Sequence, residues 1–199
     1  MEKGLKIGIA LNNVFLVAVG VVILWLAYRA QFWPEVQVLW TVDSWPKTIG
    51  AFVVGITISL GLLWLVIQLK KADLPDTNGS QFILELMQMK GTPFFVIALL
   101  PAFVEEFLFR GAIQHVLQQK WSLLTSLLIT ALLFTLVHIA DQYKGQYYIL
   151  ALVLILGLLL GVQYAFTGNL WASVLTHFAY NSMSIIWMRK GYVRIRSEA

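Results

Sequence analysis

Two adjacent carboxylates and a guanidinium interrupt the apolar stretch PFFVIALLPAFVEEFLFRGAIQHVL, which begins at Pro93. A charged side chain at the centre of a membrane helix costs about 2.5–3.5 kcal/mol on insertion scales, so such residues are rare and usually functional. Glu106 and Arg110 are spaced i,i+4 with the acid first, which favours an ion pair on one helical face. Glu105 points about 100° away. Without a local partner, its carboxylate is the better candidate for a general base.

Two further apolar stretches each carry a histidine one helical turn from a second notable residue. Phe134 and His138 form one such pair, and His177 and Asn181 form the other. Polar groups inside a membrane face the interior of a helix bundle, because lipid cannot satisfy them. Together with the carboxylates, these groups could position a water, deprotonate it and stabilise an oxyanion. Taken singly, an intramembrane histidine is more often a helix-bridging hydrogen-bond group than a catalyst, and a Glu–Arg pair is as often structural as functional. Proton-transport sites use the same residue types.

The composition indicates that a membrane bundle positions these residues. The chain has 199 residues, of which 59% are hydrophobic and 12% are charged, whereas soluble domains are about 45–50% apolar and about 25% charged. Six hydrophobic segments are each about 18–27 residues long, enough to cross a ~30 Å apolar layer. They lie at 7–28, 49–69, 92–118, 122–140, 147–166 and 170–188. The sequence therefore predicts an all-α, polytopic membrane helix bundle with about six transmembrane helices.

The basic residues predict how the bundle is oriented. Most Lys and Arg residues of the connections fall on one side of a six-span bundle, whereas Arg29, Lys47 and Lys120 fall on the other. The positive-inside rule then places both termini in the cytoplasm. The formal charge of +4 is scattered rather than gathered in a stripe, so we expect membrane lipids and no nucleic acid as neighbours. Cysteine is absent, which excludes a cysteine nucleophile and a thiolate metal site.

The chain divides by composition into three parts. We expect two spans and a cytoplasmic loop in 1–91, the chemical core in 92–188 and a basic cytoplasmic tail in 189–199. The Trp-rich loop 29–47 is typical of an outer interfacial segment, because Trp favours the headgroup region. Residues 81–89 fit a short helix that lies on the membrane or packs on its neighbours, with equal support for both.

The proline of the third segment raises a question of depth. Pro101 should leave the carbonyl of Ile97 unbonded and kink the helix. In the six-span arrangement His138 lies near the end of its helix, whereas Glu105 lies near the middle of a long one. A separate or re-entrant segment over 92–100 would bring the two to one depth, and an unbroken helix would contradict it.

Two other features predict structure rather than chemistry. Gly157 and Gly161 form a GxxxG pattern in the fifth segment, which favours close helix packing. His115 lies near the end of its hydrophobic segment, so we place it at the membrane interface.

The three motifs, taken in order, resemble those of the CAAX-protease and bacteriocin-processing family, also called the Abi family. Its best-known eukaryotic member is the Ras-converting CAAX endoprotease. The flanking sequences FRG and NLWASVLTH extend the resemblance, which covers roughly 92–188. The matching residues are Glu105, Glu106 and Arg110, then Phe134 and His138, then His177 and Asn181.

The resemblance implies a membrane endopeptidase that hydrolyses a peptide bond near the cytoplasmic face. In such an enzyme Glu105 and His138 would activate the attacking water, and His177 and Asn181 would stabilise the oxyanion. The supporting residues would be Glu106, Arg110 and Phe134. The substrate would be a peptide or a membrane-anchored protein, and a bacterial plasma membrane is the expected location.

Members of this family are often described as metalloproteases, which leaves zinc open as a cofactor. A metal here would be held by Glu105, His138 and His177. The residues alone argue against a tight zinc site, because there is no HExxH pattern and three helices would have to supply the ligands. A glutamate-dependent and a metal-dependent enzyme are both compatible with the sequence.

Two other functions fit the same residues. A non-proteolytic membrane scaffold or bacteriocin-immunity protein could keep the fold, although the complete motifs argue against a degenerate site. A proton-coupled transporter is disfavoured by the short chain and by the lack of a repeated half, since many transporters are built from internal repeats.

Overall fold

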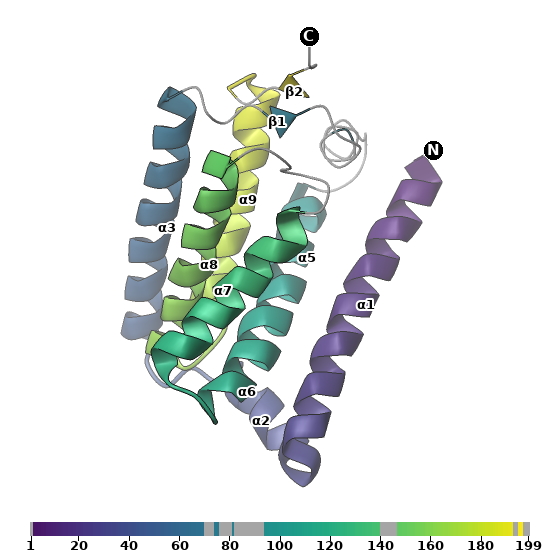
Figure 1. Ribbon diagram of the computed structural model, residues 1–199, viewed down its shortest axis with the longest axis vertical. Coiled ribbons are helices and arrows are strands. Elements are labelled where there is room, and N and C mark those ends of the chain that lie inside the picture. The colour runs from purple at the N-terminus through teal and green to yellow at the C-terminus, as the bar shows by residue number, and fades with distance from the viewer. Residues whose placement is uncertain are drawn as a thin grey trace.

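Six long helical segments make up the bundle in the part of the chain that the structure describes (Figure 1). This computed structural model describes residues 2–69, 74–75, 81, 94–139, 147–192 and 195–196. Each predicted hydrophobic segment corresponds to one of these helical segments, so the all-α prediction is confirmed. They are α1 (Glu2–Tyr28), α3 (Trp45–Gln68), the continuous run α5 (Phe94–Glu106), η2 (Phe107–Gln114) and α6 (His115–Gln118), then α7 (Leu123–Ile139), α8 (Tyr147–Thr167) and α9 (Trp171–Arg189).

The start of α1 and the end of α9 lie at one end of the bundle (Figure 1). At that end the short strands β1 (Leu74–Pro75) and β2 (Ile195–Arg196) pair in parallel. The 3₁₀ turn η1 (Arg29–Gln31) and the short helix α2 (Phe32–Val38) lie at the opposite end. Termini on one side agree with an even number of spans, and the cytoplasmic orientation itself stays a prediction.

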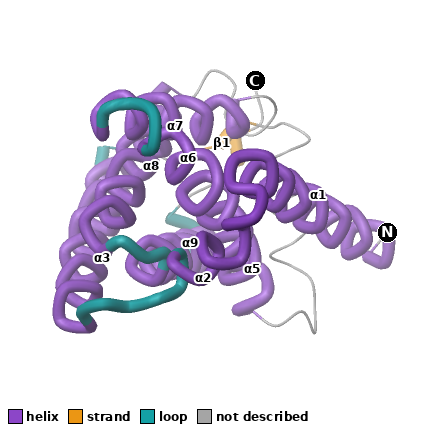
Figure 2. Tube along the Cα trace, turned by 90° about the horizontal axis from the view of Figure 1, so that it is seen from below, coloured by secondary structure: helices purple, strands orange, loops and turns teal. Residues whose placement is uncertain are grey.

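Three helical stretches are long and apolar enough to cross a membrane by length and composition, namely Ala10–Val38, Trp45–Gln68 and Tyr147–Thr167. Leu123–Ile139 is a shorter apolar helix. The helices that carry the carboxylates and His177 include more polar residues, which lowers their hydropathy. Figure 2 shows α1 leaning away from the other helices toward its N-terminus. Much of its apolar surface, such as Val14 and Phe15, is exposed, as suits a lipid-facing helix.

The helix that carries the carboxylates does not break at Pro101. It remains helical from Phe94 through Pro101, so the predicted separate segment is wrong for its described part, 94–100. The irregularity comes later, where Phe107–Gln114 form a π-helix. Such wider turns are rare and are found frequently at functional sites.

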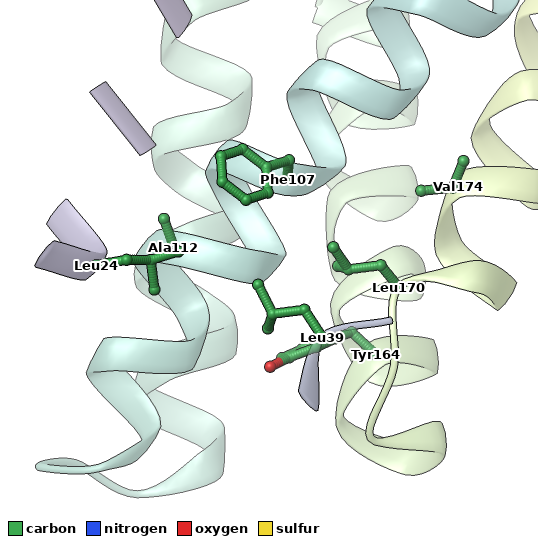
Figure 3. Packing of buried hydrophobic residues seen from close by; sticks show 7 residues of the cluster. All are labelled: Leu24, Leu39, Phe107, Ala112, Tyr164, Leu170 and Val174. Carbon is green, nitrogen blue, oxygen red and sulfur yellow. The ribbon is translucent and has the colours of Figure 1, made fainter. Parts of the chain in front are cut away.

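The Trp-rich loop closes the end of the bundle opposite the termini. Leu39 is fully buried, and its carbonyl accepts a hydrogen bond of 2.8 Å from the backbone N–H of Leu170. The indole N–H of Trp171 donates to the carbonyl of Trp40 at 3.0 Å. Figure 3 shows the apolar cluster beneath this loop, formed by Leu24, Leu39, Phe107, Ala112, Tyr164, Leu170 and Val174. The loop is therefore part of the core. The predicted short helix at 81–89 lies outside the described residues except for Gln81.

Candidate active site

Glu106 is the centre of a buried network that joins three helices. Its Oε1 accepts a hydrogen bond from Arg110 Nη1 at 3.1 Å and another from His177 Nδ1 at 2.9 Å. The side chains of Glu106 and Arg110 are both 0% exposed. Arg110 Nη2 donates to the carbonyl of Gly157 on α8 at 2.9 Å. Glu106 and Arg110 thus form the ion pair that their spacing indicates, and this pair also fixes one nitrogen of His177.

The hydrogen bonds of the two histidines define their tautomers. His177 Nδ1 lies against the Glu106 carboxylate, and His138 Nδ1 lies 2.6 Å from the carbonyl of Phe134. Neither oxygen can donate, so each Nδ1 must carry the hydrogen. In the neutral ring the Nε2 atom then bears a lone pair. Both imidazoles therefore present a basic nitrogen on the side away from their anchors.

These two basic nitrogens face the same carboxylate. Glu105 Oε2 lies 4.0 Å from His138 Nε2 and 3.9 Å from His177 Nε2. The oxygen is buried, and it makes no hydrogen bond with any residue that the structure describes. The side chains of Glu105 and His138 are both 20% exposed, whereas that of His177 is 5% exposed. Glu105 and His138 are thus brought together at one depth without the predicted re-entrant segment.

The Phe134 ring lies against both histidines and the arginine of the site. Its ring centroid is 4.7 Å from that of His138 and 5.8 Å from that of His177. The guanidinium carbon of Arg110 lies 4.7 Å from the centre of the same ring, a cation–π contact. Because one ring touches both imidazoles and the guanidinium, a change in its position would move all three.

The GxxxG glycines do more than allow close packing. A Cβ at Gly157 would lie 3.3 Å from Phe134 Cδ1, so α7 and α8 approach closely there as predicted. The carbonyls of Gly157 and Gly161 also accept hydrogen bonds from Arg110 and Gln114 of η2. The expectation that packing is their whole role is therefore incomplete. Gln114 is fully buried and was not among the predicted site residues. Its position one turn after Arg110 on the same helix could have indicated it.

Asn181 lies beside the helix of the carboxylates. Its Nδ2 donates to the carbonyl of Ala98 at 3.3 Å, one turn before Pro101. The amide nitrogen carries two hydrogens, and this bond uses only one of them.

His115 belongs to a second polar cluster outside the site. Its Nε2 lies 2.9 Å from Glu35 Oε2, and its Nδ1 lies 2.7 Å from the Tyr164 hydroxyl. The residue is buried, and its position at the membrane interface stays a prediction. Glu35 on α2 covers the imidazole ring. The hydrophobic segment that contains His115 gives no sign of this contact with a distant residue.

The donor types of Glu105, His138 and His177 suit zinc, but their spacing does not. Donor atoms on tetrahedral zinc lie about 3.3 Å apart when the bonds are about 2.0–2.1 Å, whereas these lie 3.9 and 4.0 Å apart. Among the described residues, no group of three His, Cys, Asp or Glu side chains is arranged to hold a metal. The spacing of these three donors therefore does not fit a zinc ion.

Residues 89–183 match the protein family described as "Type II CAAX prenyl endopeptidase Rce1-like". The matched range contains all three motifs and the network around Glu106. This segment belongs to the Rce1-like family. The Rce1-like segment thus includes every residue of the site described above, and the predicted resemblance is confirmed.

A curated bacterial protein is also similar to this chain. It is the "Uncharacterized protein YpbD" of Bacillus subtilis (strain 168), 31% identical over 99 residues. The alignment covers 49% of this chain and 47% of that protein, so the chain spans about half the length of its relative. No solved structure gives a significant match. The apolar helices and the Rce1-like segment together indicate an integral membrane protein.

Proposed function

We propose that this protein is an intramembrane endopeptidase in which Glu105 activates water to hydrolyse a peptide bond. One observation carries the proposal, namely the convergence of His138 Nε2 and His177 Nε2 on Glu105 Oε2. If a water oxygen lay 2.8 Å from each of two groups that are 3.9–4.0 Å apart, its two hydrogen bonds would form an angle of about 90°. This angle is within the range of hydrogen-bonded water. The site can therefore hold a water between the carboxylate and an imidazole.

The proposed step begins with a proton transfer from this water to Glu105. The water oxygen forms a bond to the carbonyl carbon of the substrate, and His138 Nε2 accepts a hydrogen bond from the second water hydrogen. Glu105 then delivers its proton to the amide nitrogen as the C–N bond breaks. The carboxylate is regenerated, and the step needs no other reactant.

His177 needs a second proton before it can donate to the oxyanion. Its Nδ1 hydrogen is already bound to Glu106, so only a hydrogen on Nε2 could reach the substrate. The remaining amide hydrogen of Asn181 would be the second donor.

For the whole protein we propose a multi-pass arrangement with both termini in the cytoplasm, in a bacterial plasma membrane. The distribution of Lys and Arg supports the orientation, and the bacterial relative supports the location. The proposed substrate is a peptide or a membrane-anchored protein. The family description names prenyl endopeptidases, so the first assay should compare prenylated with unmodified peptides.

The decisive experiment measures peptide cleavage by the purified protein in detergent, with and without a chelator. We expect Glu105→Gln to reduce cleavage at least about 100-fold, because general-base catalysis contributes roughly 10²–10⁴-fold. Glu35→Gln is the matched control, since this carboxylate also pairs with a histidine but lies outside the site. Chelator sensitivity would overturn the metal-free route. If wild type were inert on every peptide and Glu105→Ala still rescued a deletion phenotype in cells, the protein would instead be a scaffold.

A further inference from the structure

A groove between α3 and α8 lies outside the active site, in the half of the bundle that ends at α2 (Figure 1). It has a volume of about 440 Å³, within the range of about 300–1,000 Å³ typical of small-ligand sites. Its lining is apolar along most of its length. The lining residues that matter here are Lys47, Gly50 and Val54 of α3, and Leu159, Val162 and Phe166 of α8.

The shape of the groove depends on glycines, which have no side chain. A Cβ at Gly50 would have no neighbour within 4 Å, so the space beside this residue is open. The space beside Gly55 is instead filled by the Gln163 carboxamide. Its Nε2 donates to the Ala51 carbonyl at 2.6 Å and to Thr176 Oγ1 at 2.9 Å. This amide seals the floor of the groove from the bundle interior. The opening therefore faces outward, toward the lipid.

One end of the groove carries a positive charge. Lys47 is exposed, and its Nζ lies 4.7 Å from the centre of the Phe166 ring. Among the described residues, no carboxylate lies within 4.0 Å of this ammonium group. Lys47 follows Trp45 at the start of α3. The helix α2, which carries exposed Trp33, lies at the same end of the bundle, and exposed Trp121 follows α6, which ends there. Exposed tryptophans at one level mark the headgroup region of a bilayer.

We propose that this groove binds a phospholipid with an anionic headgroup. The acyl chain would lie along Gly50, Val54 and Val162, and the phosphate would lie against Lys47. An apolar slot that ends in an unpaired cation at headgroup depth is complementary to such a lipid in both shape and charge. The proposal concerns lipid binding alone and does not depend on peptidase activity.

The test is a native mass-spectrometry titration of the purified protein with phosphatidylglycerol and with phosphatidylcholine of the same acyl chains. We expect tighter binding of phosphatidylglycerol. Lys47→Ala should weaken it about fivefold, since a basic residue near an anionic lipid contributes about 1 kcal/mol. Lys47→Arg should bind phosphatidylglycerol as tightly as wild type does. Lys120→Ala is the control, because Lys120 is exposed in the turn after α6 and does not line the groove.

A second pair of variants tests the slot itself. Gly50→Leu should remove one bound lipid of either headgroup by filling the open space. Gly61→Leu should not, although its Cβ would also meet nothing within 4 Å and it lies on the same helix outside the groove. Equal binding by wild type and Lys47→Ala, or full binding by Gly50→Leu, would overturn the proposal. So would cross-linking of Val162→Cys copies in membranes, which would show a second copy of the chain in the groove.

Discussion

At the scale of single residues, two adjacent carboxylates have opposite surroundings. Glu106 is fully buried and its Oε1 is bonded to Arg110 and His177, whereas Glu105 is partly exposed and its Oε2 lies near the Nε2 atoms of two histidines. The two differ because neighbours on a helix point about 100° apart. One faces α8 and α9 and is neutralised, and the other faces the imidazole nitrogens that we propose hold the water.

This contrast predicts that the same substitution affects stability at one position and cleavage at the other. Glu106→Gln should destabilise the protein by about 3–5 kcal/mol, because it leaves the guanidinium of Arg110 buried without its counter-charge. Glu105→Gln should leave stability nearly unchanged while reducing cleavage at least about 100-fold. Thermal unfolding in detergent and a peptidase assay would measure the two effects. Equal loss of stability in both variants would contradict the assignment.

Arg110 should not tolerate replacement by lysine. Its two nitrogens donate to Glu106 and to the Gly157 carbonyl, and its plane lies over Phe134. An ammonium group cannot reproduce this geometry. We expect Arg110→Lys to cost about 1–3 kcal/mol, the loss associated with an unsatisfied buried group. Chemical denaturation against wild type measures this cost, and a cost below that range would show that charge alone is sufficient.

At the scale of the elements, the site depends on how closely α7 approaches α8. The glycine at 157 lets Phe134 approach the α8 backbone, and its carbonyl holds Arg110. His138 lies one turn beyond Phe134 on the same helix. The distance between α7 and α8 therefore helps to set the position of His138 relative to Glu105.

Widening this contact should impair both folding and chemistry. Gly157→Leu would press against Phe134 and Ala131, whose atoms already lie 3.3–3.4 Å from a Cβ there. Overpacking of this kind costs about 1–3 kcal/mol, and we expect cleavage to fall further than stability. Gly61→Leu in open space is the control, and it should leave both properties intact. Full activity of Gly157→Leu would show that the site does not depend on this packing.

At the scale of the whole molecule, a polar contact ties the covering loop to the bundle. His115 joins Glu35 of α2 to Tyr164 of α8. Because the Glu35 side chain is 29% exposed, solvent weakens part of its contact with His115. We expect Glu35→Ala to cost about 1 kcal/mol in thermal unfolding and to leave the rate of cleavage per folded molecule unchanged. A selective loss of cleavage would mean that the loop contributes to catalysis.

The sequence predicted the helices well because lipid imposes a simple requirement on them. Backbone groups in a bilayer must be bonded within the helix, and the surrounding side chains must be apolar. All six hydrophobic segments therefore appear as helices within a few residues of their predicted bounds. The i,i+4 spacing of Glu106 and Arg110 was equally local, and their ion pair is present in the structure.

Contacts between distant segments could not be read in this way. The sequence did not indicate that Glu106 binds His177, that Arg110 reaches the Gly157 carbonyl, or that Glu35 covers His115. It also did not mark the π-helix, and it suggested a break at Pro101 where the helix continues. Each of these depends on atoms from another helix, or on a small change of backbone winding that has no distinct residue pattern.

By itself, the sequence determined the class of protein, the elements and the residue types available for chemistry. The tertiary structure decided which carboxylate is neutralised and which one faces the two basic nitrogens. The physical reason is that hydropathy and helical spacing act within about two turns of a chain. The surroundings of Glu105 are instead set by the packing of α5 against α9 and of η2 against α7 and α8.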